Sequence, residues 1–88
     1  MVHTRRDDLI DIHDEVRKRF ARLNGRERKV MGLVADGLSS EPMSELLNVQ
    51  PRTAQSYLNQ VKYKMGADSI VSLFVMARLC SNELPHAA

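Results

Sequence analysis

The side chains best suited to chemistry lie in residues 51–66, PRTAQSYLNQVKYKMG, directly after a short turn. Apolar residues recur there at spacings of four, three and four, which predicts a helix with one buried side. The opposite side carries amide, guanidinium and ammonium groups rather than a row of like charges. Amides can pair with the edge of adenine, and Arg or Lys can pair with guanine. The pattern fits two interpretations: a surface that contacts base edges, and an ordinary solvated face.

On the first interpretation, seven side chains of this segment would contact double-stranded DNA. We predict that four of them read bases: Gln55, Ser56, Asn59 and Lys62. The other three are predicted to hold the phosphate backbone: Arg52, Thr53 and Lys64. Charge supports this division, because residues 51–66 hold three basic and no acidic side chains, whereas residues 30–50 hold three acidic and no basic ones. A basic stripe is a modest indication of a phosphate-binding surface.

The rest of the chain predicts further helices, so the expected fold is all-α. Residues 7–22 place Leu9, Ile12, Val16 and Phe20 on one stripe of an amphipathic helix. Asn24 and Glu27 form a capping-box pair that starts a second helix, which Gly37 would end in the left-handed conformation. A third, short helix follows Ser39 and Ser40, with Met43, Leu46 and Leu47 facing inward. The last helix covers residues 69–80, and residues 81–88 are expected to be a frayed tail.

A short helix, a tight turn and a second helix with a polar outer face form a helix-turn-helix arrangement. The segment around it resembles the DNA-binding domain of the LuxR/FixJ/NarL transcription factors, and most closely the FixJ branch. The matching residues are Leu23, Arg26, Glu27, Val30, Met31, Gly37, Leu38, Ser39, Leu47, Val49, Pro51, Arg52, Thr53, Val61, Lys64, Met65, Gly66 and Ala67. The resemblance implies a four-helix bundle over residues 23–80, a recognition helix at 52–65 and a dimer contact on the last helix. Residues 1–22 would then be an additional N-terminal amphipathic helix or linker.

The last helix is more apolar than one buried face requires. Ile70, Leu73, Phe74 and Ala77 are expected to face the core. The remaining apolar side chains are predicted to form a homodimer interface: Val71, Val75, Met76 and Leu79. An exposed apolar patch usually marks an interface. The alternative is burial beneath the N-terminal helix, whose own surface could instead receive a partner protein.

The sequence therefore predicts a bacterial, cytoplasmic and nucleoid-associated transcriptional regulator, and no enzyme, metal site, cofactor or membrane span. Its three His residues are far apart, no nucleophile–base pair is evident, and no apolar run reaches the roughly 20 residues that span a bilayer. A stand-alone regulator is favoured over a segment of a two-domain one. The rival function is a helical interaction module that antagonises a full-length regulator through its last helix. The acidic Glu41, where the resembled family usually has Lys, motivates that alternative.

Overall fold

The computed structural model describes residues 12–84, and within this range the chain is helical with no strand. Residues 12–20 are the described part of the N-terminal helix, whose predicted beginning at residues 7–11 lies outside this range. The other elements are α2 (Gly25–Ala35), α3 (Ser40–Leu47), α4 (Pro51–Met65), α5 (Ile70–Leu79) and the 3-10 turn η1 (Ser81–Glu83). The predicted all-α fold is confirmed.

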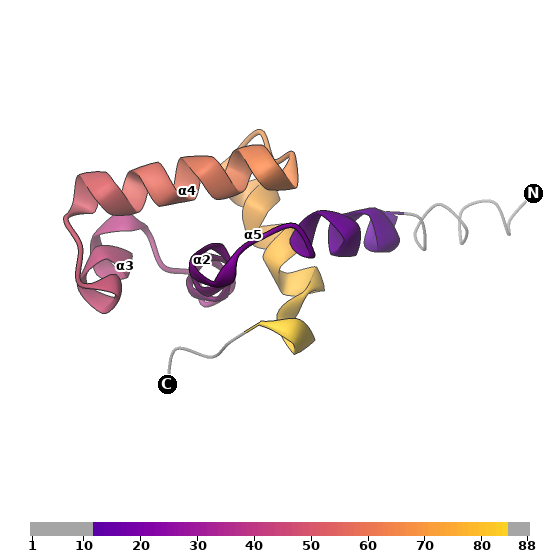
Figure 1. Cartoon of the computed structure of the whole chain (residues 1–88), viewed down its shortest axis with the longest axis horizontal. Coiled ribbons are helices and arrows are strands. Elements are labelled where there is room, and N and C mark those ends of the chain that lie inside the picture. The colour runs from indigo at the N-terminus through magenta and orange to yellow at the C-terminus, as the bar shows by residue number, and fades with distance from the viewer. Residues whose placement is uncertain (1–11, 85–88) are drawn as a thin grey trace, which may run out of the picture.

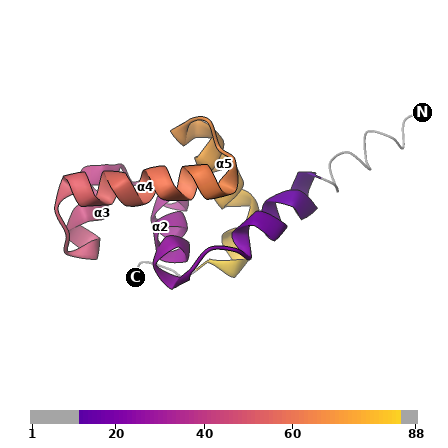
Figure 2. The ribbon, with the colours of Figure 1, turned by 45° about the horizontal axis from the view of Figure 1, so that its top comes forward.

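The longest of these helices, α4, lies across the others (Figure 1). Its beginning packs against α3, α2 passes beneath its middle, and α5 crosses near its end, an order that the turned view in Figure 2 repeats. The N-terminal helix lies beside α5 and points away from the rest of the domain. One side of α4 is therefore supported along its length, while none of the helices in residues 12–84 lies over the other side.

The core draws on every helix, including the N-terminal one. Its largest fully buried side chains are Met31, Met43, Met65 and Leu73. Val16 and Phe20 of the N-terminal helix belong to the same cluster, as predicted from their spacing, but Ile12 on that stripe is 56% exposed. Within the described part of the N-terminal helix, Val16 and Phe20 therefore belong to the hydrophobic core and Ile12 does not.

Arg28 of α2 stabilises the connection between the N-terminal helix and α2 through two hydrogen bonds. Its Nε donates to the Leu23 carbonyl at 3.1 Å and its Nη2 to the Ala21 carbonyl at 3.2 Å. The guanidinium also lies 5.0 Å from the centre of the Phe20 ring. One side chain of α2 thus contacts both the connection and the end of the N-terminal helix, and so links the two helices.

The helix ends follow the local rules that the sequence indicates. Asn24 Oδ1 accepts from the Glu27 amide at 2.8 Å, and Glu27 Oε1 accepts from the Asn24 amide at 2.9 Å, which is the predicted capping box. Gly37 and Gly66 follow α2 and α4 with φ of 83° and 72°, in the region that favours glycine. The predictions of the capping box and of the left-handed Gly37 are confirmed.

Two predictions at the periphery are wrong. Leu46 of α3 was expected to face inward, but it is 54% exposed, and only Met43 and the half-buried Leu47 of that helix join the core. Residues 81–88 were expected to fray, which is wrong for residues 81–84, since Ser81–Glu83 form η1 and Leu84 is buried in the core cluster. The buried side chain of Leu84 anchors η1 to the core, which explains why these residues form a regular turn. The rest of this predicted tail, residues 85–88, lies outside the described range.

Candidate nucleic-acid interface

The pair α3–α4 has the geometry of a helix-turn-helix. The turn between them passes through Asn48, which has φ 57° and closes α3 in the left-handed conformation, and Pro51 opens α4 in its first turn. Asn tolerates that conformation better than most side chains, and Pro costs little where no intrahelical N–H bond is needed. A turn of three residues brings α4 directly against α3.

The buried side of α4 is the predicted one. Ala54, Leu58, Val61 and Met65 are each exposed by 4% or less. These four side chains press α4 onto the core and so fix which side chains turn outward. The rotational setting of the helix is therefore determined by hydrophobic packing rather than by its polar residues.

The predicted contact residues are mostly free of that packing. Arg52, Gln55, Ser56 and Asn59 are exposed, whereas Thr53 and Lys62 are half-buried on the flanks. Gln55 Nε2 donates to Asn59 Oδ1 at 3.2 Å, so these two amides of successive turns lie side by side. The outward face thus presents donors and acceptors together, with Lys62 at its margin.

Two exposed side chains of the same face lie outside the predicted set: Gln60 and Tyr63. Tyr63 is 88% exposed, so its ring takes no part in the core. Residues 52, 56, 59 and 63 follow spacings of four, three and four, so the helical period itself would have placed Tyr63 at the centre of the face.

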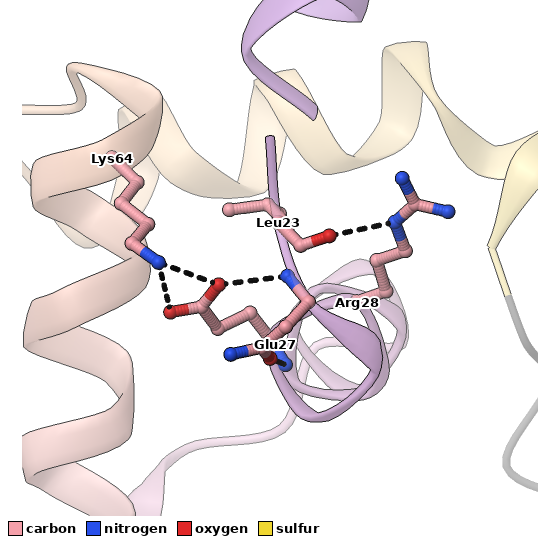
Figure 3. A network of polar contacts seen from close by, with 5 residues as sticks. Leu23, Glu27, Arg28 and Lys64 are labelled. Atoms are coloured by element: carbon pink, nitrogen blue, oxygen red, sulfur yellow. Dashed lines mark hydrogen bonds and ion pairs between the residues drawn. The ribbon is translucent and has the colours of Figure 1, made fainter. Parts of the chain in front are cut away.

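Lys64 has a partner inside the protein. Its Nζ lies 2.8 Å from Glu27 Oε2 and 3.0 Å from Glu27 Oε1, as Figure 3 shows. The Glu27 side chain is 4% exposed and that of Lys64 is 42% exposed. The same carboxylate therefore caps α2 and holds the end of α4. A phosphate contact by Lys64 stays a prediction, but the ammonium already has a role in the fold.

The charge of Glu27 is stabilised despite its position. Burial alone raises the pKa of this carboxyl, but several other effects outweigh it. The hydrogen bonds from Lys64 and from the Asn24 backbone, with the positive charges of Lys64 and Arg26, leave the pKa of Glu27 below its ordinary value of 4.5. Glu27 is therefore an anion at neutral pH.

Two arginines from other helices contact α4, one at its middle and one at its end. The Arg26 guanidinium lies over the Tyr57 ring at 4.3 Å from its centre, joining α2 to the half-buried side of α4. Arg19 Nη1 donates to the Met65 carbonyl at 2.9 Å, and its Nε contacts Glu15 Oε2 at 3.1 Å. The N-terminal helix thus supplies a donor to the last turn of α4, whose carbonyls lack intrahelical partners.

The apolar surface of α5 differs in part from the prediction. Val71, Val75 and Leu79 are exposed, but Met76 is half-buried and packs against the core. Ile70 and Phe74, expected in the core, are exposed as well. Leu73 and Ala77 are the buried residues of this helix. The exposed apolar side chains of α5, which we call the α5 patch, are Ile70, Val71, Phe74, Val75 and Leu79.

Within residues 12–84, no group of three His, Cys, Asp or Glu side chains is placed to hold a metal ion. None of the helices described is both long enough and apolar enough to cross a bilayer.

The fold and the α3–α4 geometry define a helix-turn-helix protein. Residues 21–77 match the family model described as bacterial regulatory proteins, luxR family, and the chain belongs to this family. The transcriptional regulatory protein FixJ of Azorhizobium caulinodans is 39% identical over 69 residues, which are 78% of this chain and 33% of that protein. FixJ of Rhizobium meliloti is 34% identical over 68 residues, 77% of this chain and 33% of that protein. These two relatives confirm the resemblance to the FixJ branch.

A third relative is much longer. The putative HTH-type transcriptional regulator Rv0890c of Mycobacterium tuberculosis is 44% identical over 61 residues, 65% of this chain and 7% of that protein. The chain thus spans about a third of the FixJ proteins and a small fraction of Rv0890c. No solved structure gave a significant match.

Proposed function

We propose that the chain is a sequence-specific DNA-binding transcriptional regulator of the bacterial cytoplasm that inserts α4 into the major groove. The observation that carries this proposal is the outward face of α4. Arg52, Gln55, Ser56 and Asn59 are exposed there, while the opposite side of the helix is fixed in the core. An α-helix fits the major groove, and its exposed amides can pair with base edges.

The chemistry and position of each side chain on this face indicate whether it would contact bases or phosphates. Gln55, Ser56, Asn59 and Lys62 would read bases, the last from the margin of the face. Arg52 and Thr53 lie in the first turn of α4, where backbone N–H groups and the helix dipole favour a phosphate. Selection of bound duplexes from a random pool, followed by titration, would test the proposal and define the operator. Binding that does not distinguish the selected sequence from a scrambled one would overturn it.

Asn59→Ala is expected to weaken binding to the selected duplex by about 1–3 kcal/mol, because one paired amide is lost. Fluorescence anisotropy at constant salt would measure this. The matched control is Asn82→Ala, which removes the same exposed group from η1, on the far side of the core from α4 (Figure 1). Equal affinities of the two variants would show that the reading face is wrongly assigned.

A dimer would place two copies of α4 on one side of the DNA. We propose that the α5 patch provides the contact, since five large apolar side chains on one helix are exposed and Val71 reaches 68%. Half-sites about 10 bp apart would then present successive major grooves to the two copies of α4. The partner surface would be the same patch on a second copy.

Val75→Glu is expected to shift the monomer–dimer equilibrium towards the monomer, since it places a charge in the middle of the α5 patch. Sedimentation equilibrium over a range of concentrations would show this. Gln60→Glu adds the same charge on α4, outside the patch, and should leave self-association unchanged. A wild-type protein that stays monomeric at millimolar concentration and on DNA would count against the interface.

The α5 patch also supports a second candidate function. The chain could use this fold to bind a full-length regulator through α5 and antagonise it, without contacting DNA itself. The two functions differ in one measurement: the regulator binds a selected duplex with an affinity that falls with salt, and the antagonist does not. We favour the regulator, because the outward face of α4 has no role in the antagonist.

A further inference from the structure

We propose that Arg22 and Tyr63 form an additional contact with the DNA backbone, on phosphates beyond the base pairs that α4 reads. This inference rests on the proposed function and extends the interface from α4 to the end of the N-terminal helix. Arg22 and Tyr63 line one surface hollow together with Glu15, Arg19, Lys64 and Gly66. The hollow therefore joins the outward face of α4 to a segment before the helix-turn-helix.

Among the described residues, the charges around this hollow leave Arg22 as its available cation. The Arg19 guanidinium contacts Glu15 and the Met65 carbonyl, and the Lys64 ammonium contacts Glu27. Glu15, the acidic residue of the hollow, is thus already paired. The Arg22 side chain is exposed, and its guanidinium contacts no carboxylate among residues 12–84. A free guanidinium next to neutralised pairs suits a phosphate group.

The position of Tyr63 on α4 supports the same contact with the DNA backbone. It lies four residues after Asn59, one helical turn further and about 40° around the axis, so it continues the line of the predicted base contacts. A helix that enters the groove by its N-terminal turns has its last turns nearer the rim, where the sugar–phosphate backbone runs. A phenol that is 88% exposed there can donate its O–H to a phosphate oxygen. No packing role accounts for an aromatic ring so far from the core.

Arg22→Gln tests the contact through the salt dependence of binding. Losing one phosphate contact should reduce the slope of log K against log salt by about 0.9 and weaken binding about three- to tenfold at low salt. Lys29→Gln is the matched control: it removes one exposed charge from α2, about 200° around that helix from Glu27, which faces α4. Arg22→Lys should restore the slope. Equal slopes for Arg22→Gln and Lys29→Gln would overturn the proposal.

Tyr63→Phe separates the hydrogen bond from the charge. It should weaken binding about two- to tenfold with no change of the salt slope, because the ring stays and only the hydroxyl is lost. Wild-type affinity for this variant would remove Tyr63 from the contact.

Shortened duplexes locate the contact on the DNA. If it lies beyond the base pairs that are read, trimming the flanking base pairs on one side should weaken the wild type and leave Arg22→Gln unaffected. A difference between the two proteins that persists on the trimmed duplex would place Arg22 elsewhere. These outcomes are distinct from failure of the proposed function, which would appear as loss of sequence preference in the wild type itself.

Discussion

Replacing Phe20 with alanine is expected to lower the free energy of unfolding by about 3–5 kcal/mol, the usual cost of truncating a buried aromatic side chain. Phe20 is 4% exposed, belongs to the same core cluster as Leu73, and supports the Arg28 guanidinium over its ring. Its removal would leave a cavity under the connection to α2. Small domains have about 5–15 kcal/mol of stability in total, so this loss would remove a large share of it.

Urea denaturation followed by circular dichroism would measure the change. Ile12→Ala is the control, because it truncates an apolar side chain of the same helix that is 56% exposed, and it should cost less than about 1 kcal/mol. If the two variants were equally stable, the N-terminal helix would be an appendage and not part of the domain. The result therefore decides whether the folding unit begins before residue 21, where the family match begins.

Lys64→Met is expected to lower the free energy of unfolding by about 2–3 kcal/mol. The substitution leaves the Glu27 carboxylate buried, with the Asn24 backbone amide as its one remaining hydrogen-bond donor within residues 12–84. Breaking a fully buried ion pair costs about 3–5 kcal/mol, and a smaller value applies here because Lys64 is 42% exposed. Lys62→Met, on the half-buried flank of the same helix, is the control and should change the stability much less.

The pH dependence of this effect has a defined sign. In the wild type the lowered pKa of Glu27 stabilises the fold above pH 4.5, and this contribution is lost as the pH falls through the lowered value. In Lys64→Met, burial is no longer outweighed, so the pKa of Glu27 should rise above its ordinary value. The stability of the variant should then decrease as the pH rises above the ordinary value of 4.5. The stability of the wild type instead increases as the pH rises through the lowered pKa.

Adding Glu27→Gln to Lys64→Met gives an independent check. Glutamine keeps an oxygen that can accept from the Asn24 amide but removes the buried charge, so the double variant should be more stable than Lys64→Met at pH 7. Urea titrations between pH 3 and pH 7 would compare the three proteins. A double variant no more stable than Lys64→Met would show that the charge of Glu27 has little influence.

Much of the fold was predictable because its determinants are local. The capping box of Asn24 and Glu27 acts over three residues, and Gly37 and Gly66 end helices through their own backbone freedom. The buried side of α4 follows from the helical period alone, and with it the exposure of Gln55 and Asn59. That exposure is the part of the candidate site on which the proposed function depends.

The side chains wrongly predicted to be buried share a physical cause. A helical stripe shows which residues share a side, but not whether another element covers it. Ile12, Leu46, Ile70 and Phe74 lie on apolar stripes and are exposed because no other described helix extends over them. The pairing of Lys64 with Glu27, 37 positions apart, likewise has no local signal. Contacts between distant segments are set by how the helices pack as a whole.

The way α4 is held has a consequence for recognition. Four side chains anchor it in the core, while Arg19 and the Glu27 carboxylate hold its last turn from two other helices. A docking surface that is already rigid loses little conformational entropy when a ligand arrives. The energy of each new hydrogen bond then goes into discrimination between ligands rather than into ordering the helix, and preorganisation of α4 becomes a source of selectivity in its own right.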